Sequence, residues 1–224
     1  MHRRRQPRKS FNQQGYDMNL SNTQRLMKLT SNLIANPDLI TPWVKQSLLY
    51  RGFPVDLELP WWSYRAIEAA DTIAPGRRIF EYGTGGSTLR YGKVAKSIVS
   101  IEDNLMWLDI MRDRLNKHGI EATLFHHEFD FKNPMNFEES SYLMSIDSND
   151  WDMLIIDGQD ESFEQRLACF RHAEPSAEPG DIIIVDDFWR YECLLKESRA
   201  KEVDVFESVG PCRIGVTSTA FFHY

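Results

Sequence analysis

The sequence predicts an α/β fold, with a mostly parallel sheet, a C-terminal antiparallel hairpin and an N-terminal helical cap. From residue 77 onward, short runs that are apolar nearly throughout alternate with amphipathic stretches, which is typical of a parallel sheet with helices on both faces. Two extended runs near the C-terminus are joined across Gly210-Pro211, which is too short for a crossover helix, so they should form an antiparallel hairpin. The residues before 77 instead carry the start and stop signals of helices.

Three helices are expected in the N-terminal cap. Ser21 and Gln24 have the spacing of a capping box, and the helix that they begin should end at Asn36-Pro37, because the residue before a proline disfavours helical backbone. Thr41-Pro42 predicts a second helix start, with Gly52 as its terminator. A third helix should open at 60–63 and run to about residue 73.

The alternating part predicts five parallel strands, three helices between them and the hairpin. The parallel strands are expected at 78–81, 98–102, 122–125, 153–157 and 181–186. The helices are expected at about 87–96, 104–118 and 161–174, and the hairpin strands at 203–207 and 214–222.

Composition limits the kind of protein that this chain can form. With 224 residues, of which 42% are hydrophobic and 26% charged, the chain is long enough for one globular domain with its own core. Its three cysteines form no C-x-x-C pair, which excludes a disulfide scaffold or a cysteine zinc cluster. Because free cysteines favour a reducing compartment, we expect a cytoplasmic protein. No apolar run approaches the ~20 residues of a membrane span.

Charge is distributed unevenly along the chain. The net charge is −7, although residues 1–9 hold five arginines and lysines and no acid. The rest has 21 basic against 33 acidic residues, a poor balance for a nucleic-acid backbone. We therefore expect a neutral or cationic small ligand and neither a membrane nor a nucleic acid as partner, while a homo-oligomer remains open.

The same patterns divide the chain into three parts. We expect a disordered basic tail at 1–16, the helical cap at 17–76 and a ligand-binding domain at 77–224. A transit peptide and a tether for nucleic acid are the alternatives for the tail.

A glycine-rich turn, Glu-Tyr-Gly-Thr-Gly-Gly-Ser at 81–87, follows the first predicted strand. Its glycines permit positive φ values and close approach of a ligand to the backbone. The G-x-G-x-x-G spacing of dinucleotide sites fails because Thr88 stands at the third glycine, and Glu81 would lie awkwardly beside a pyrophosphate. The same carboxylate suits a ligand with an ammonium and a sulfonium. Glu102, at the end of the second strand, can accept both hydroxyls of a ribose.

At these residues the chain resembles the class I S-adenosylmethionine-dependent methyltransferases. Their glycine turn reads acid-x-G-x-G-x-G; Gly83 and Gly85 match it, and Ser87 replaces the third glycine. The resemblance covers about residues 77–224 and implies a Rossmann-like fold that binds S-adenosylmethionine, with Glu81 and the glycines at the methionine end and Glu102 at the ribose. The candidate cofactor-binding residues are Glu81, Tyr82, Gly83, Thr84, Gly85, Gly86, Ser87, Glu102, Asp103 and Asp157.

Two motifs that are missing from the sequence limit the class of methyl acceptor. The D/N-P-P-Y/F turn of methyltransferases acting on base amino groups is absent after the fourth strand, which ends in Asp157-Gly158-Gln159. The paired hairpin glutamates of arginine methyltransferases have no counterpart either. These absences favour a hydroxyl oxygen of a small molecule or sugar. Asp157 and Asp160 are the candidates for the catalytic group that takes the acceptor's proton.

Three acidic residues follow neighbouring strands of the predicted sheet. Asp157 ends the fourth strand and Asp186 and Asp187 end the fifth, so their carboxylates should converge at one edge of the sheet. They would repel one another without a cation, and oxygen ligands of this kind suit magnesium. The arrangement resembles the metal-dependent O-methyltransferases of the catechol and macrocin types, so we expect a magnesium site. The alternative is that these acids cap loops or helix N-termini, as in metal-free methyltransferases.

Aromatic and basic side chains are expected to select the acceptor. Arg190 is a candidate either for holding an anionic acceptor or for pairing with Asp187. The sequence thus predicts a small-molecule methyltransferase, with a catalytically inactive cofactor-binding module tethered by the basic tail as the alternative. Four tryptophans offer apolar surfaces for stacking a ring or sugar: Trp43, Trp61, Trp62 and Trp189.

Overall fold

The computed structural model describes residues 20–133 and 135–224. The predicted basic tail at 1–16 and the first residues of the predicted cap lie outside these ranges. Within the described ranges, no helix combines the length and the apolar character needed to cross a bilayer.

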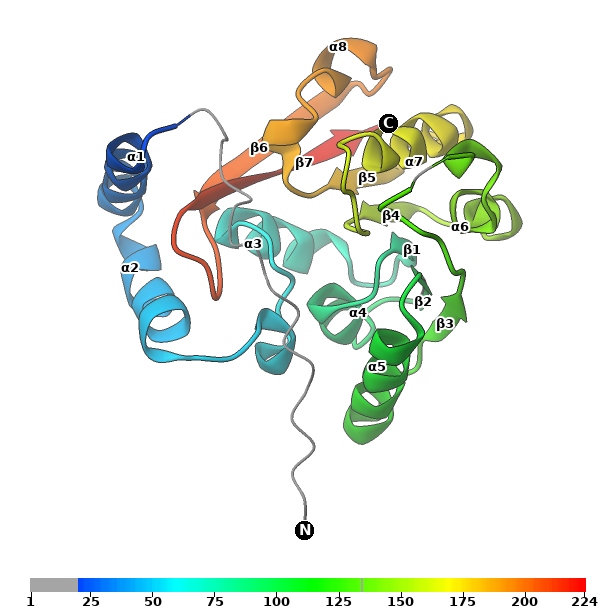
Figure 1. Cartoon of the computed structure of the whole chain (residues 1–224), viewed down its shortest axis with the longest axis horizontal. Helices are drawn as coiled ribbons and strands as arrows, with labels where there is room; N and C mark the ends of the chain where they lie inside the picture. The colour runs from blue at the N-terminus through cyan, green and yellow to red at the C-terminus, as the bar shows by residue number, and fades with distance from the viewer. Residues whose placement is uncertain (1–19, 134) are drawn as a thin grey trace.

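Seven strands form one sheet in the order β3-β2-β1-β4-β5-β7-β6 (Figure 1). The hairpin of β6 (Glu202–Val209) and β7 (Val216–His223) is antiparallel, and β7 also pairs antiparallel with β5. The order reverses between β1 and β4, where open α/β sheets form a ligand crevice at the carboxyl ends of their strands. The predicted Rossmann-like sheet and its closing hairpin are therefore confirmed. The parallel strands are β1 (Arg78–Tyr82), β2 (Ser97–Glu102), β3 (Thr123–His126), β4 (Met153–Ile156) and β5 (Ile182–Val185).

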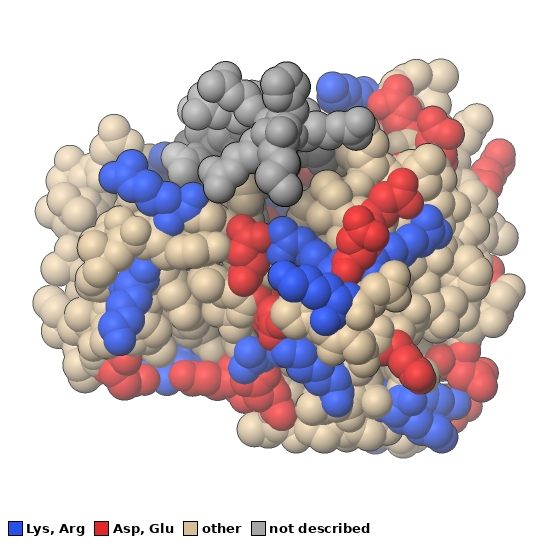
Figure 2. All heavy atoms as spheres, turned by 90° about the horizontal axis from the view of Figure 1, so that it is seen from below, with Lys and Arg blue, Asp and Glu red and all other residues tan. Residues whose placement is uncertain are grey.

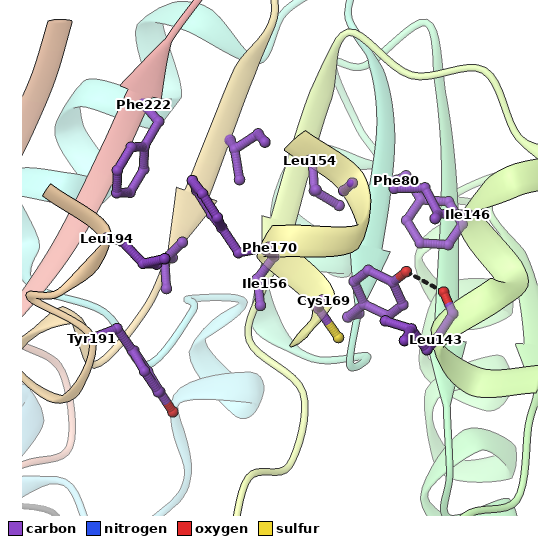
Figure 3. Close-up of a cluster of buried hydrophobic side chains, with 14 of the residues drawn as sticks. Phe80, Leu143, Ile146, Leu154, Ile156, Cys169, Phe170, Tyr191, Leu194 and Phe222 are labelled. Carbon is purple, nitrogen blue, oxygen red and sulfur yellow. Dashed lines mark hydrogen bonds between the residues drawn. The ribbon is translucent and has the colours of Figure 1, made fainter. Parts of the chain in front are cut away.

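Helices cover both faces of this sheet. α3 (Tyr64–Ile73) packs on the face that includes Ile79 and Ile184. The opposite face is covered by α6 (Ser141–Met144) and α7 (Gln165–Ala173). There the ring of Phe170 on α7 meets that of Phe222 on β7, with centroids 4.7 Å apart (Figure 3). α4 (Gly86–Tyr91) and α5 (Leu105–His118) share a smaller apolar cluster beside β2 and β3.

The N-terminal cap lies beside the β6–β7 hairpin (Figure 1). α1 (Asn22–Ala35) begins with the predicted capping box, in which Ser21 Oγ accepts from the Gln24 N–H and Gln24 Oε1 accepts from the Ser21 N–H. α2 (Ile40–Trp43) continues directly into a π-helical segment, η2 (Val44–Leu49). The Trp43 indole N–H donates to the Arg213 carbonyl at 3.0 Å, so the cap is tied to the loop between β6 and β7.

Short helical segments lie between the longer helices and the strands. Those between β3 and β4 carry no periodic apolar pattern and were not predicted. The segments are η1 (Pro37–Leu39), η3 (Pro54–Leu57), η4 (Phe137–Glu139), η5 (Ser145–Ser148), η6 (Glu174–Ser176), η7 (Phe188–Arg190) and α8 (Leu194–Glu197).

Two helices are shorter than the sequence predicts. The helix expected at 87–96 ends at Tyr91, because Gly92 begins a turn in which the Val94 and Ala95 N–H groups return to the Tyr91 carbonyl. The helix expected at 161–174 begins only at Gln165, because the preceding residues form a loop with Phe163 in the left-handed region.

Charges on the surface are mixed rather than segregated. On the face shown in Figure 2, Lys and Arg side chains lie beside Asp and Glu side chains. Oppositely charged side chains also form ion pairs within the described residues, for example Arg65 with Asp38 at 2.9 Å and Arg90 with Asp71 at 2.5 Å.

Candidate active site

A cleft of about 1090 Å³ lies at the carboxyl ends of the parallel strands. Its floor is formed by the glycine turn after β1, the ends of β2 and β4, and the turn after β5. The cap, α5 and the loop between β6 and β7 contribute to its wall. The cleft therefore lies where the strand order reverses, as expected for a ligand site in this class of sheet.

Close backbone contacts explain two glycines of the turn. Gly83 has φ +92°, and a Cβ there would lie 2.8 Å from the Gly158 Cα, so the turns after β1 and β4 touch. A Cβ on Gly86 would overlap the Leu59 carbonyl of the cap. These two positions shape the cleft by letting neighbouring backbones approach.

Glu81 lies beneath the glycine turn and does not line the cleft. It is fully buried and accepts hydrogen bonds from three hydroxyls, those of Ser87, Thr88 and Ser100. Burial raises the pKa of Glu81 to about 7, against the opposing effect of these donors. Strand alternation points the side chain toward α4 and away from the cleft, so the structure gives no support to the predicted contact of Glu81 with the methionine end.

The Glu81 carboxylate instead fixes the turn from below. The Gly85 N–H donates to Thr88 Oγ1 at 2.9 Å, and that hydroxyl donates onward to Glu81 at 2.5 Å. A buried carboxylate thus sets the position of a backbone amide at the cleft surface.

Tyr82 points to the opposite face of the sheet. Its ring is buried in the core under α6, and its hydroxyl donates to the Leu143 carbonyl at 2.6 Å (dashed line in Figure 3). The placement of this side chain gives no support to the prediction that Tyr82 binds the cofactor, again because successive strand residues alternate between faces.

Glu102 lines the cleft at the end of β2. One of its oxygens accepts from the Thr84 N–H at 3.2 Å and the Thr84 hydroxyl at 2.9 Å, and the other from the Asn104 N–H at 3.0 Å. Burial, followed by repulsion from Asp103, raises the pKa of Glu102 to about 7. Asp103 and residues 83–87 also line the cleft, so the structure brings these candidates together.

Asp157 lines the cleft at the end of β4, between the two halves of the sheet. The Trp62 indole N–H donates to its Oδ2 at 3.0 Å, and Arg166 Nη2 lies 3.1 Å from its Oδ1. Burial raises the pKa of Asp157, although Arg166 and Trp62 act in the opposite direction. Asp157 is therefore a carboxylate held in a fixed orientation at the centre of the cleft.

The carboxylates of Asp186 and Asp187 have protein partners. The Thr219 hydroxyl donates to Asp186 at 2.7 Å, and the Thr217 hydroxyl donates to Asp187 at 3.3 Å. Burial, then repulsion from Asp157 and Asp187, raises the pKa of Asp186 well above its usual range. Burial acts to raise the pKa of Asp187 as well, but nearby arginines, led by Arg213, lower it overall.

The predicted magnesium site does not fit this donor set. Within residues 20–133 and 135–224, no three His, Cys, Asp or Glu side chains are grouped as a metal site would require. The convergent charges of Asp157, Asp186 and Asp187 are compensated by guanidinium groups instead. Arg166 pairs with Asp157, and Arg213 Nη1 lies 3.7 Å from Asp187. The alternative that these acids serve the protein's own loops describes the site better.

Asp160 lies outside the cleft lining, in the loop before α7. It accepts from the Phe163 N–H at 2.7 Å, the Arg166 N–H at 3.3 Å and the Tyr191 hydroxyl at 2.7 Å. This placement gives no support to the prediction of Asp160 as a catalytic base, since its carboxylate accepts from backbone N–H groups at and before the start of a helix.

Trp107, Arg166 and Arg213 are among the cleft residues that were not predicted as site residues. Trp107 donates from its indole N–H to the Thr84 carbonyl at 2.8 Å and so braces the glycine turn. Arg166 reaches the cleft from α7, and Arg213 reaches it from the loop between β6 and β7. Trp107 has a local signal, its place three residues after the helix-capping Asn104. The arginines have none, because only the fold brings them to the acids.

No protein-family model and no curated protein matches this chain. Solved structures do match. A protein from Klebsiella pneumoniae, provisionally described as an O-methyltransferase, is similar over 89% of this chain and 98% of its own, with 16% identity and a TM-score of 0.59. A provisionally described methyltransferase from Streptococcus mutans, in complex with SAH, is similar over 78% of this chain and 100% of its own, with 11% identity and a TM-score of 0.51.

A third structure is the 16S rRNA N2 G1207 methyltransferase of T. thermophilus, in complex with AdoMet and guanosine. It is similar over 77% of this chain and 43% of its own, with 14% identity and a TM-score of 0.54. At these identities the likeness concerns the fold. This chain has the Rossmann-like fold of class I methyltransferases.

Proposed function

We propose that this protein transfers a methyl group from S-adenosylmethionine to a hydroxyl oxygen of a small molecule or sugar. The observation that carries the proposal is the convergence of the glycine turn, Glu102 and Asp157 on one cleft, at the carboxyl edge of a sheet that solved methyltransferases share. Two of those solved structures are complexes with AdoMet or SAH, which supports this choice of cofactor.

In this proposal the cofactor lies over β1 and β2. Glu102 retains acceptor capacity toward the cleft and accepts from a ribose hydroxyl, because a carboxylate offers about four lone-pair sites and three are used by Thr84 and Asn104. Residues 83–85 approach the methionine part, with the Gly85 amide fixed by Thr88 and Glu81. The indole of Trp107 forms part of the wall beyond Glu102, where the adenine lies.

The acceptor occupies the half of the cleft over β5 and β7. When bound, S-adenosylmethionine supplies a methyl group on a sulfonium, and its transfer to the acceptor oxygen leaves SAH. The chain contributes alignment of the two reactants and removal of the hydroxyl proton. Asp157 takes that proton, because it stands between the two halves of the cleft and burial gives its carboxylate a greater affinity for a proton.

The size of the cleft fits a small acceptor. Small-molecule sites usually enclose about 300–1,000 Å³, so about 1090 Å³ accommodates the cofactor with a small partner. The mixed charges of the face shown in Figure 2 favour a small acceptor over a phosphate polymer.

Binding of the cofactor is the first test. Calorimetric titration should show binding of S-adenosylmethionine and SAH, and no comparable binding of NADH. Glu102→Ala should weaken the affinity for SAH by about 1–3 kcal/mol, the scale of charge-assisted hydrogen bonds to a ribose. Thr84→Val is the matched control: it removes a hydroxyl that contacts Glu102 but leaves the carboxylate, so the loss should be smaller. Equal affinity in Glu102→Ala and the wild type would overturn the placement of the cofactor.

Transfer is the second test. S-adenosylmethionine with a tritiated methyl group should label hydroxyl-bearing small molecules, and bulk RNA should stay unlabelled. Label that appears in RNA instead would replace the proposed acceptor class while leaving the cofactor assignment intact.

A further inference from the structure

Two arginines face the acceptor half of the cleft with unused hydrogen-bond donors. Arg213 and Arg190 both line the cleft, and their side chains are only 10% and 15% exposed. Within the part of the chain that the structure describes, Arg213 Nε and Nη1 and Arg190 Nε are buried and have no hydrogen-bond acceptor. Buried guanidinium donors are costly to leave without an acceptor, so these atoms point to a ligand.

The guanidinium groups are held by stacking rather than by hydrogen bonds. Arg213 lies over the Trp61 ring at 5.1 Å, and Arg190 lies over the Trp189 and Phe163 rings, each at 4.8 Å. The Arg213 backbone is fixed in addition by the bond from Trp43 to its carbonyl. Stacking fixes the planes of both groups and leaves their N–H edges available.

The carboxylate beside them does not use these donors. Asp187 lies 3.7 Å from Arg213 Nη1 and 3.9 Å from Arg190 Nη2, which is too far for a hydrogen bond. Arg166, in contrast, is fully engaged, because it donates to the Gly158 and Asp186 carbonyls and pairs with Asp157.

The balance of charge among the acids and arginines of the cleft also favours an anionic ligand. Three aspartates (Asp157, Asp186 and Asp187) face three arginines (Arg166, Arg190 and Arg213) at this end of the cleft. Burial beside two other carboxylates makes Asp186 the acid that keeps its proton most readily. A protonated Asp186 lowers the negative charge that faces these arginines, which favours the binding of an anion.

We propose that Arg213 and Arg190 form an anion-binding subsite that holds a carboxylate or phosphate group of the methyl acceptor. Arginine suits this role because its planar edge donates two parallel hydrogen bonds to either group. The inference rests on the proposed function, since it assigns the substrate class of the same cleft.

The sheet order favours the acceptor over the cofactor as the source of the anion. Glu102 and the glycine turn follow β2 and β1, whereas Arg190 follows β5 and Arg213 precedes β7. β4 with Asp157 lies between the two sets. A cofactor over β1 and β2 therefore leaves the arginines to the second ligand.

The test uses the full chain saturated with SAH and titrated with inorganic phosphate, benzoate and, as the neutral match of benzoate, benzamide. Phosphate and benzoate should bind, and benzamide should bind at least tenfold more weakly. Arg190→Gln and Arg213→Gln should each lower the affinity for the anions at least tenfold and change the affinity for SAH less than twofold. Arg213→Lys, which keeps the charge but loses the planar edge, should fall between Arg213→Gln and the wild type. Circular dichroism melting identifies any variant that fails to fold, and the other arginine then carries the test.

Three outcomes would overturn the subsite. The first is equal binding of benzoate and benzamide, and the second is anion affinity that is unchanged in both glutamine variants. The third is a loss of SAH affinity in these variants with undiminished binding of methylthioadenosine, which lacks the carboxylate, because the arginines would then hold the cofactor. Failure of the wild type to bind SAH would instead contradict the proposed function. In that case, titration of the protein without SAH would still show whether Arg190 and Arg213 bind the anions.

Discussion

The indole N–H of Trp62 donates a hydrogen bond to Asp157 Oδ2 at 3.0 Å, which joins the segment before α3 to the end of β4. Trp62 is fully buried, so this bond is shielded from water. Arg166 holds the other oxygen of the same carboxylate. Asp157 is therefore oriented from two sides by residues that are distant from it in sequence, and it lines the cleft.

Substitution of Asp157 should separate catalysis from binding. We expect Asp157→Asn to lower kcat by about 10²-fold or more, the usual contribution of a general base, because an amide cannot take up the acceptor's proton. Single-turnover transfer from tritiated S-adenosylmethionine measures this, and calorimetry with SAH should show that the cofactor still binds.

Asp160→Ala is the matched control for Asp157→Asn. It removes the carboxylate that accepts from Phe163, Arg166 and Tyr191, so it should lower the free energy of unfolding by about 1–2 kcal/mol while the folded protein keeps its turnover. Equal turnover in Asp157→Asn and the wild type, or a catalytic loss confined to Asp160→Ala, would reverse the assignment.

Stability should depend on pH through Glu81. Burial raises the pKa of Glu81 from 4.5 to about 7, so between these values the folded protein holds a proton that the unfolded chain has released. The stabilisation is complete below the unfolded value and is lost as the pH rises through about 7. Urea unfolding should therefore give a lower free energy of unfolding at about pH 8 than at about pH 5.

Glu81→Gln should reduce that pH difference by about 2 kcal/mol, because the amide does not titrate. The pKa of Glu102 is raised in the same direction, so the pH dependence of stability that Glu102 contributes should remain in this variant. Glu121→Gln is a suitable control, since this side chain is exposed and lies in water in both states. An unchanged pH difference in Glu81→Gln would argue against a buried, protonated Glu81.

Substitution by alanine should affect the adjacent glycines Gly85 and Gly86 differently. Gly86→Ala places a Cβ against the Leu59 carbonyl and should lower the free energy of unfolding by about 1–3 kcal/mol. Gly85→Ala meets no protein atom within 4 Å and should leave stability unchanged, but its methyl group should weaken SAH binding if the cofactor passes over this turn. Thermal melting and calorimetry on the same two variants measure both effects, and a stable Gly86→Ala would contradict the packing of the cap.

Chelation should leave the protein active. Because Arg166 pairs with Asp157 and Arg213 lies beside Asp187, we expect turnover and SAH affinity to be the same in excess EDTA as in added magnesium. Loss of turnover in EDTA that magnesium restores would reinstate the metal site predicted from the sequence.

Local patterns were enough to predict the sheet and the floor of the cleft. The apolar runs gave five parallel strands within a few residues, and the spacing of Ser21 and Gln24 gave the capping box that begins α1. The glycine turn and the acid that closes β2 lie next to each other in the cleft because the carboxyl ends of adjacent parallel strands share one edge.

The fold determines where the acidic side chains point and which residues they contact. Glu81 lies in a strand that is apolar on both faces, so the sequence does not say to which face its side chain points; in the structure it contacts Ser100, its register partner on β2. The metal prediction failed for a related reason. Arg166 and Arg213 are distant in sequence from the acids that they neutralise. The sequence therefore showed three aspartates without their basic partners, and a metal ion was inferred in the place of those partners.

The packing of the cap has a practical consequence for redesign. Cap residues Leu29, Trp43 and Trp62 share one apolar cluster with the strands, so the cap and the sheet are not interchangeable modules. The cap also fixes the β6–β7 loop, because Trp43 donates to the Arg213 carbonyl and Ser47 to the Gly210 carbonyl. A graft of another cap would release that loop together with Arg213, so a change of acceptor preference requires both segments to be redesigned as one unit.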